Sequence, residues 1–262
     1  MSERIADMLT KRGSRKLLVP FFTVGYPTFK RSLDLVRAAV DEGADMVELG
    51  MPFSDPMADG PQIQFSSQVA LKNDTTLKSV LKAVSDLRQT INVPLILMGY
   101  VNPIVAYSEK RFLADAANAG ADGLIIPDLP VDEAKSFKSV ADSHGLSTIF
   151  LVSPTSNKER VEQIDGLSTD FVYAVTVTGV TGSGRKFGPE TDDYLKRLKQ
   201  TLRKPYVAGF GVSSAESARR LTRYADGVVI GSKLIGLIRE AKSSREAVSR
   251  VAGFLRTIRR AI

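Results

Sequence analysis

The sequence predicts an α/β protein in which eight short parallel strands alternate with helices along residues 1–262. Short apolar segments recur with amphipathic helical segments between them, which is typical of a parallel sheet buried on both faces. Related phrases precede three of these segments, at 42–45, 119–122 and 224–227, and suggest a repeated β/α unit. Right-handed crossovers repeated eight times can close a sheet into a barrel. We therefore expect a single (β/α)8 barrel, the TIM barrel, as one domain.

An open doubly wound sheet is the alternative fold for such an alternation. Sheets of that type that bind dinucleotides carry a GxGxxG motif directly after the first strand. The first apolar run, 17–24, contains no such motif and is followed by Gly25 and Pro27. The barrel is therefore the preferred prediction.

The elements of the first half are bounded by turn and cap residues. Residues 2–12 carry apolar side chains at helical spacing and predict an N-terminal helix. Thr28 starts the helix after the first strand, and Gly43 stops it. An extra helix is expected at 61–73, after the second strand. Strands are expected at 17–24, 46–49, 94–100 and 123–127, and further helices at 74–90, 109–119 and 131–143, with a turn at Asn102 and Pro103.

The second half continues the same alternation. Ser213 and Ser214 are suitable caps for a helix that ends near Tyr224. A long loop with four glycines is expected at 178–189. Strands are expected at 146–152, 171–176, 205–210 and 226–230, and further helices at 157–164, 190–202 and from 232 onward.

The composition excludes several kinds of chemistry. There is no cysteine, which rules out disulfides, thiol catalysis and cysteine metal sites. His144 is the single histidine, so a histidine-rich metal site is excluded and a Ser-His-Asp triad is disfavoured. Asp55, Asp59 and Asp128 lack the spacing of a metal-binding loop, and we expect no metal.

The net charge of +7 raises the question of an acidic partner. Lysine and arginine are spread along the predicted helices, and the arginine-rich stretch 245–260 lacks interleaved aromatic residues. We interpret that stretch as the solvated face of a final helix and expect no nucleic acid. Because we find neither a signal peptide nor an apolar run of about 20 residues, we expect a cytoplasmic protein that does not enter a membrane.

Glu48 interrupts the apolar second strand, and it is the one acid within the apolar part of any predicted strand. The loop that follows carries Asp55 and Asp59 among prolines and glycines. Active sites of such barrels lie at the C-terminal ends of the strands, which favours a general acid or base on a rigid strand end and a second acid on a mobile loop. The alternative is that Glu48 faces solvent and the aspartates cap turns.

Several apolar and aromatic residues lie in or at the ends of other strands. Those whose side chains point inward could line a pocket for a flat aromatic group, and the alternative is that they are plain barrel core. These residues are Phe21, Phe22, Leu97, Tyr100, Leu124, Ile126 and Tyr173.

Glycine follows three consecutive predicted strands, and this pattern indicates a phosphate site. The segments are 179–182, 209–214 and 231–232, of which the last begins a helix. Barrels of this kind bind phosphate with the loops after strands seven and eight and a helix N-terminus. Glycine lets backbone N–H groups approach the phosphate, and the helix end adds partial positive charge. Together with Glu48, this site suggests proton transfer on a small phosphorylated metabolite.

The motifs resemble the tryptophan synthase alpha subunit family over nearly the whole chain, in order. The segment from Glu48 to Asp59 is the most specific of them. The segments that carry the resemblance are 47–61, 20–27, 97–104, 123–130, 179–182 and 209–213.

The resemblance implies a barrel that cleaves indole-3-glycerol phosphate to indole and glyceraldehyde 3-phosphate. It implies that Glu48 moves protons at indole C3 and at the glycerol hydroxyl, while Asp59 interacts with the indole N–H. Phe21 and Tyr173 would help line the indole pocket. Thr181 would position Asp59 when its loop closes.

The resemblance also implies the remaining binding groups and partners. Gly182, Gly211, Gly231 and Ser232 would hold the phosphate through backbone groups. A beta subunit would receive the indole through a tunnel in an alpha2beta2 heterotetramer. Pyridoxal phosphate would lie in that partner, and this chain would carry no cofactor.

Two other functions fit the same residues. Another phosphate-binding barrel enzyme is the first, although no lysine ends strands one to four as a Schiff-base aldolase would require. A binding or activating subunit that has lost the reaction is the second, because a fold alone does not prove activity.

Overall fold

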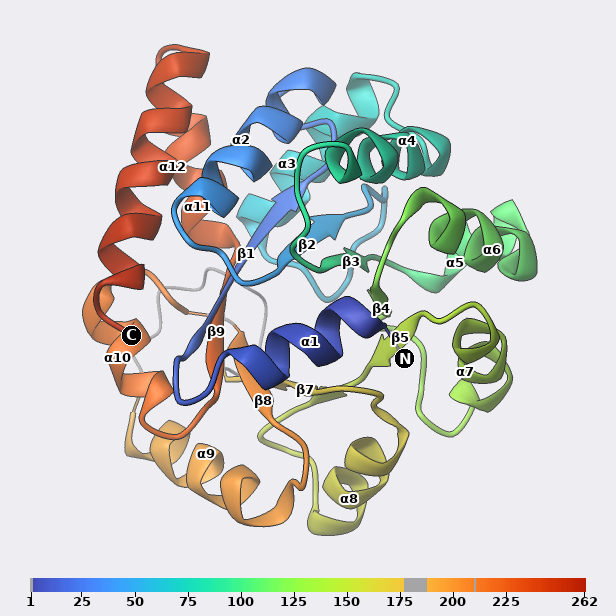
Figure 1. Ribbon diagram of the computed structural model, residues 1–262, viewed down its shortest axis with the longest axis vertical. Helices are drawn as coiled ribbons and strands as arrows, with labels where there is room; N and C mark the ends of the chain where they lie inside the picture. The colour runs from blue at the N-terminus through green and yellow to red at the C-terminus, as the bar shows by residue number, and fades with distance from the viewer. Residues whose placement is uncertain (1, 177–187, 210) are drawn as a thin grey trace.

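The computed structural model describes residues 2–176, 188–209 and 211–262. In this part of the chain, nine strands form the centre and helices surround them (Figure 1). The strands are β1 (Leu17–Thr23), β2 (Val47–Gly50), β3 (Leu95–Met98), β4 (Gly123–Ile125), β5 (Ser147–Ile149), β6 (Leu151–Val152), β7 (Val172–Val175), β8 (Tyr206–Gly209) and β9 (Gly227–Ile230).

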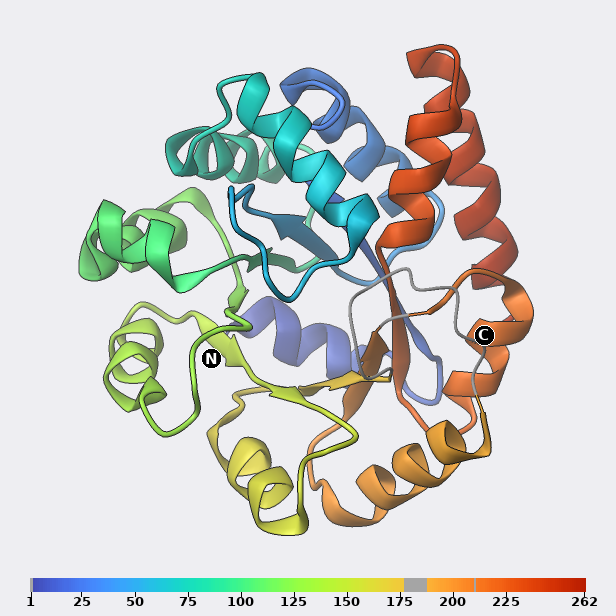
Figure 2. The same cartoon turned by 180° about the vertical axis from the view of Figure 1, so that it is seen from behind.

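The helices follow the strands along the chain and form an outer ring, which the view from behind also shows (Figure 2). They are α1 (Glu3–Lys11), α2 (Phe29–Asp41), α3 (Pro61–Lys72), α4 (Leu77–Arg88), α5 (Val101–Tyr107), α6 (Glu109–Ala119), α7 (Ala134–Ser143), α8 (Lys158–Leu167), α9 (Pro189–Thr201), α10 (Ala215–Thr222), α11 (Ser232–Glu240) and α12 (Ser244–Arg259). None of the helices in the described ranges is both long and apolar enough to cross a membrane.

The strands form one parallel sheet in the order β5-β4-β3-β2-β1-β9-β8-β7-β6. The two outer strands of this order, β5 and β6, are halves of the predicted fifth strand and are separated by Phe150. The Phe150 carbonyl accepts a hydrogen bond of 3.1 Å from Tyr173 N–H, and the Thr148 carbonyl accepts one of 2.9 Å from Thr169 N–H. The divided strand therefore closes the sheet, and the predicted (β/α)8 barrel is confirmed.

One predicted connection is wrong. Asn102 and Pro103 were expected to form a turn, but they lie in the first turn of α5. Proline is tolerated there because the first N–H groups of a helix have no partner within the helix. The extra helix after the second strand is confirmed as α3, which begins with Pro61 after the N-cap Gly60.

The core has two layers, which follow from the alternation of side chains along each strand. Side chains inside the barrel form a separate apolar cluster that includes Val19, Met46 and Ile96. Ile5 of α1 belongs to the same cluster, and α1 lies across one end of the barrel (Figure 1). The alternate side chains point outward and pack against the helices.

The recurring phrases before three strands have a structural role. Each supplies a buried or half-buried aspartate whose carboxylate accepts a hydrogen bond from a backbone N–H at the start of the neighbouring strand. These bonds are Leu18 N–H to Asp45 (2.8 Å), Leu95 N–H to Asp122 (2.8 Å) and Tyr206 N–H to Asp226 (3.1 Å). The same aspartates form ion pairs with Arg259, Arg88 and Arg12, respectively. The repeat thus fixes the N-terminal ends of the strands, opposite the end where a barrel places its catalytic groups.

Candidate active site

Glu48 lies inside the barrel. In β2 it pairs with Phe21 of β1 and Ile96 of β3, and it is two residues after the inward-facing Met46. The residue is 1% exposed, and neither of its carboxylate oxygens has a hydrogen-bond partner among the described residues. Burial raises the pKa of Glu48 to about 8. The alternative in which Glu48 faces solvent is therefore wrong, and the group is mostly protonated at neutral pH.

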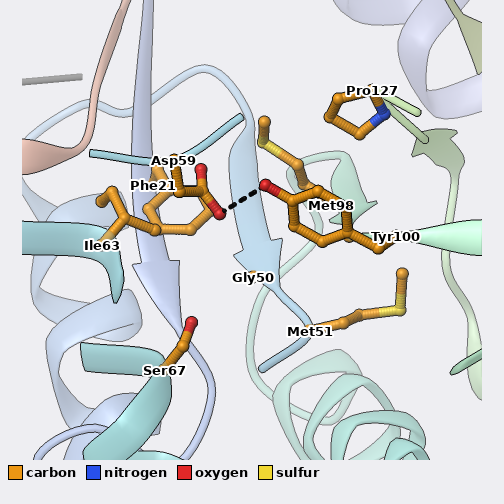
Figure 3. A pocket seen from close by; sticks show the side chains of 10 residues that line it. Phe21, Gly50, Met51, Asp59, Ile63, Ser67, Met98, Tyr100 and Pro127 are labelled. Carbon is orange, nitrogen blue, oxygen red and sulfur yellow. Dashed lines mark hydrogen bonds between the residues drawn. The ribbon is translucent and has the colours of Figure 1, made fainter. Parts of the chain in front are cut away.

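Asp59 lies on the loop between β2 and α3, one residue before the helix N-cap. Its N–H donates to the Pro56 carbonyl at 3.0 Å, and its Oδ2 accepts a hydrogen bond of 3.0 Å from the Tyr100 hydroxyl (Figure 3). Burial raises the pKa of Asp59 to about 6, and the hydrogen bond from Tyr100 opposes this rise. Asp59 is therefore mostly ionised at neutral pH, unlike Glu48.

Tyr100 connects the end of β3 to the loop that carries Asp59. Its hydroxyl accepts a hydrogen bond of 3.1 Å from Ala58 N–H while it donates to Asp59. Its ring lies 5.3 Å from the ring of Phe53, centroid to centroid. The loop is thus held to Tyr100 at three places, and this connection was not visible in the sequence, which suggested Tyr100 as a pocket residue only.

A pocket opens beside these residues at the C-terminal end of the barrel. Phe21 and Tyr100 line it, and Asp59 forms part of its wall (Figure 3). The other lining residues are Gly50, Met51, Ile63, Ser67, Met98, Gly99 and Pro127. Sequence reasoning missed these, although the spacing of Ile63 and Ser67, one helical turn apart on α3, was a usable signal.

Four of the suggested pocket residues point away from the barrel interior. Phe22, Leu97, Leu124 and Ile126 belong to the outer core between strands and helices. They alternate with inward-facing residues such as Phe21 and Met98, so the plain-core interpretation is correct for them.

Tyr173 of β7 is 3% exposed and belongs to the cluster inside the barrel. Burial raises the pKa of its hydroxyl well above the ordinary value, and the carboxyl groups of Glu48 and Asp59 raise it further. A Cβ atom on Gly209 would lie 2.1 Å from the Tyr173 hydroxyl oxygen. Glycine at the end of β8 therefore makes room for this hydroxyl, and Tyr173 lies in the same electrostatic environment as both acids.

The candidate phosphate-binding residues lie only partly within the described chain. Gly231 is the N-cap of α11 and Ser232 its first residue. A Cβ atom on Gly231 would lie 3.4 Å from the Phe21 ring, which places this helix start beside the pocket. Gly211 has a φ of +80°, where a side chain is strained. Thr181 and Gly182 lie outside the described residues.

The chemistry available to the site is that of its two acids and its apolar wall. Within residues 2–176, 188–209 and 211–262, no three acidic or histidine side chains are grouped closely enough to hold a metal ion. The arrangement can transfer a proton from Glu48 and stabilise positive charge with Asp59, and Phe21 and Met98 give the pocket an apolar lining.

Known proteins with similar sequences share this arrangement of elements. The family model of the tryptophan synthase alpha chain matches residues 8–262. The tryptophan synthase alpha chain of Prosthecochloris aestuarii is 42% identical over 265 residues, which cover 98% of each chain.

Solved structures agree with this result. The tryptophan synthase alpha chain of Legionella pneumophila superposes with a TM-score of 0.91 at 35% identity, covering 100% of this chain and 97% of that one. A structure of the tryptophan synthase alpha2beta2 complex of Pyrococcus furiosus gives a TM-score of 0.85 at 37% identity, covering 93% and 98%. With a matching family model, relatives above 40% identity and the same barrel, this chain belongs to the tryptophan synthase alpha chain family.

Proposed function

We propose that this chain is the lyase that cleaves indole-3-glycerol phosphate to indole and glyceraldehyde 3-phosphate in tryptophan biosynthesis. One observation carries the proposal: Glu48 is a buried carboxylic acid without a described hydrogen-bond partner, and its pKa of about 8 keeps it protonated at neutral pH. Cleavage of a bond to indole C3 requires a proton at that carbon, and a positioned acid supplies it.

Two proton transfers complete the reaction. Glu48 first delivers its proton to indole C3, and the ring becomes a cationic indolenine. The Glu48 carboxylate then accepts the proton of the hydroxyl on the adjacent glycerol carbon. The carbon–carbon bond breaks, its electron pair returns to the ring, and the hydroxyl carbon becomes the aldehyde. Glu48 ends protonated, as it began.

Asp59 stabilises the cationic intermediate. Its ionised carboxylate accepts a hydrogen bond from the indole N–H. Positive charge develops on this nitrogen in the transition state, and the carboxylate stabilises it. Tyr100 already donates to Oδ2, which leaves Oδ1 as the oxygen available to the indole N–H. Two acids with pKa values of about 8 and about 6 thus take opposite protonation states at pH 7.

The remaining groups bind the two ends of the substrate. Phe21 and Tyr173 enclose the indole, and the start of α11 at Gly231 and Ser232 holds the phosphate with backbone N–H groups. Gly211, Gly182 and Thr181 complete the phosphate site and the closing loop, as the resemblance implies. Gly231 beside Phe21 supports this assignment, because it brings a helix N-terminus to the pocket.

A beta subunit is the proposed partner, in an alpha2beta2 heterotetramer that receives the indole and holds the pyridoxal phosphate. The similar tryptophan synthase of Pyrococcus furiosus forms an alpha2beta2 complex. In this chain, Met57 is 87% exposed on the loop after β2 and Val105 is 60% exposed on α5 after β3. Both side chains follow the C-terminal ends of strands, where the proposed partner would cover them. We further propose that residues 1–262 form one domain and act in the cytoplasm.

The test is a steady-state assay of indole release from indole-3-glycerol phosphate, with the chain alone and with a beta subunit. Turnover in both cases is expected, with a larger rate in the complex. Absence of indole release in both cases, with a folded chain, would refute the proposed function and leave the two alternatives, another phosphate-binding barrel enzyme and a non-catalytic subunit.

A further inference from the structure

Gln64 of α3 is in direct contact with the main chain of Asp59. Its side-chain Nε2 donates a hydrogen bond of 2.9 Å to the Asp59 carbonyl oxygen. Gln64 is half-buried, and its own backbone N–H donates to the Gly60 carbonyl at 3.0 Å as part of the helix. The Gln64 side chain therefore joins α3 to the residue that carries the second acid, although Gln64 is not among the residues that line the pocket.

The start of α3 explains why this contact matters. The helix begins with Pro61 after the N-cap Gly60, and within the described part of the chain no side chain caps this start. Glycine has no side-chain oxygen that could accept an N–H, and proline has no backbone N–H to donate. In many helices a Ser, Thr or Asp at this point connects the loop to the first turn. Here the side chain of Gln64, the fourth residue of the helix, makes the connection.

Asp59 is held by hydrogen bonds at its N–H, its carbonyl and its carboxylate. The N–H donates to the Pro56 carbonyl at 3.0 Å, the carbonyl accepts from Gln64, and Oδ2 accepts from the Tyr100 hydroxyl at 3.0 Å. The two main-chain bonds fix the peptide planes on either side of the Asp59 Cα atom, and these planes set the direction in which the side chain leaves the backbone. Tyr100 holds one carboxylate oxygen, whereas the main-chain bonds orient the whole residue.

We infer that Gln64 is a positioning residue, which holds the main chain of Asp59 so that the carboxylate meets the indole N–H. The inference rests on the proposed function, in which that carboxylate stabilises a developing positive charge. Such stabilisation depends steeply on geometry, and a displacement of about 1 Å is enough to lower the rate. In this role Gln64 touches neither the substrate nor the reacting atoms.

The variant that tests this role is Gln64→Met, which removes the amide donor and keeps an unbranched side chain of similar length. Methionine and glutamine have similar helix propensities, so α3 is expected to form normally. Gln68→Met is the matched control, since Gln68 is an exposed glutamine one helical turn further along the same helix. Both variants are assayed as full chains, with saturating beta subunit, for indole release from indole-3-glycerol phosphate.

Gln64→Met should lower kcat and kcat/KM in parallel by about threefold to tenfold, as expected for one lost hydrogen bond. The two constants should fall together because Asp59 acts on the charge that develops in the transition state. Inhibition by the product glyceraldehyde 3-phosphate should not change, since this product has no indole N–H for Asp59 to bind. Gln68→Met should behave like the wild type in both measurements.

A double-mutant cycle with Asp59→Asn separates positioning from a general structural role. The carboxylate is already absent in the Asp59→Asn background, so adding Gln64→Met there should lower the residual rate less than about twofold. Amide hydrogen exchange of residues 57–59 gives a second readout that requires no activity. These N–H groups should exchange faster in Gln64→Met than in Gln68→Met or the wild type, because the loop loses its connection to α3.

Three results would each overturn the inference. The first is a wild-type rate in Gln64→Met. The second is an equal loss of rate from Gln64→Met in the wild-type and Asp59→Asn backgrounds, because Gln64 would then act independently of Asp59. The third is unchanged exchange of residues 57–59 in Gln64→Met, because the loop would then be held without Gln64. A wild-type chain that releases no indole, alone or with a beta subunit, would instead refute the proposed function, and hydrogen exchange would still show whether Gln64 holds the loop.

Discussion

Glu48 and Asp59 are two carboxyl groups that both act on Tyr173, and their own environments separate their pKa values. Glu48 is buried without a described partner, whereas Asp59 keeps a hydrogen bond from Tyr100 that favours its ionised form. The proposed reaction requires Glu48 protonated and Asp59 ionised. Both conditions hold together only between the two pKa values, about 6 and about 8.

The pH dependence of kcat/KM is therefore expected to be bell-shaped. Activity should fall as the pH rises through about 8, because Glu48 loses its proton, and as the pH falls through about 6, because Asp59 gains one. Steady-state rates between pH 5 and pH 9 measure this profile. A rate that keeps rising above pH 8 would contradict the role of Glu48 as an acid.

Glu48→Gln should lower turnover by roughly a hundredfold or more, since the amide keeps the shape and cannot deliver a proton. The same variant should differ in stability. The folded-state pKa of Glu48 is raised from 4.5 to about 8, so the free energy of unfolding of the wild type should decline as the pH rises from about 4.5 to about 8. Denaturant unfolding at several pH values should show this decline in the wild type and a smaller one in Glu48→Gln. Near-normal indole release by the variant would refute the assignment.

The connections at the C-terminal ends of β2 and β3 work as a pair. The loop after β2 carries Asp59, and Tyr100 at the end of β3 holds that loop through Ala58 N–H and the Asp59 carboxylate. Because Tyr100 caps the start of α5, its position is fixed by a strand and a helix. Tyr100, which is fixed between β3 and α5, therefore positions Asp59 on the neighbouring loop.

Tyr100→Phe should lower kcat/KM roughly tenfold, as expected for a lost hydrogen bond to a charged group. It should also move the acidic limb of the pH profile upward, because the lost hydrogen bond had lowered the pKa of Asp59. Tyr107→Phe is the control, because the Tyr107 hydroxyl donates a hydrogen bond of 2.8 Å to Asp115 and neither residue lines the pocket. If both variants behave alike, Tyr100 does not position Asp59.

The opposite end of the barrel is held by the repeated aspartates. Asp122 is 1% exposed and accepts bonds from Leu95 N–H, the Ser2 hydroxyl and two arginines, Arg4 and Arg88. Asp122→Ala should lower the free energy of unfolding by about 3–5 kcal/mol, because it leaves Arg88 half-buried and without its carboxylate. Asp86→Ala removes an exposed pair with Lys82 and should cost less than about 1 kcal/mol. Denaturant unfolding of both variants measures the difference, and equal losses would contradict the structural role of the repeat.

The groups that stabilise the barrel and the groups proposed for the reaction lie at opposite ends of it. The buried aspartates and α1 lie at the N-terminal ends of the strands, and the acids and the pocket lie at the C-terminal ends. The catalytic end also exposes Met57 on the Asp59 loop and Val105 on α5. A partner that covers these side chains would restrict the motion of the loop that carries Asp59.

Turnover by the chain with saturating beta subunit is expected to exceed turnover by the chain alone by tenfold to a hundredfold. This corresponds to about 1.4–2.8 kcal/mol, an ordinary coupling free energy. Thr181→Val should weaken the response if Thr181 contacts Asp59 as the resemblance implies. Equal rates with and without the partner would show that the loop closes unaided.

Local sequence was enough to predict the order of the elements, the barrel and the position of Glu48. Periodic apolar segments and cap residues such as Thr28 and Ser214 act over short distances, and both residues cap their helices in the structure. The turn expected at Asn102 and Pro103 failed because proline is compatible with both a turn and a first helical turn. The neighbouring residues do not distinguish the two.

Which side chains meet depends on the packing of the whole barrel. The sequence suggested Tyr100 as a pocket residue, but its hydrogen bond to Asp59 depends on β2 and β3 being neighbours in the sheet. Ser67 resembled any helical serine until the packing of α3 placed it in the pocket. The pKa of Glu48 likewise depends on how completely the closed barrel removes water around it, because desolvation is a property of the surroundings and not of the residue.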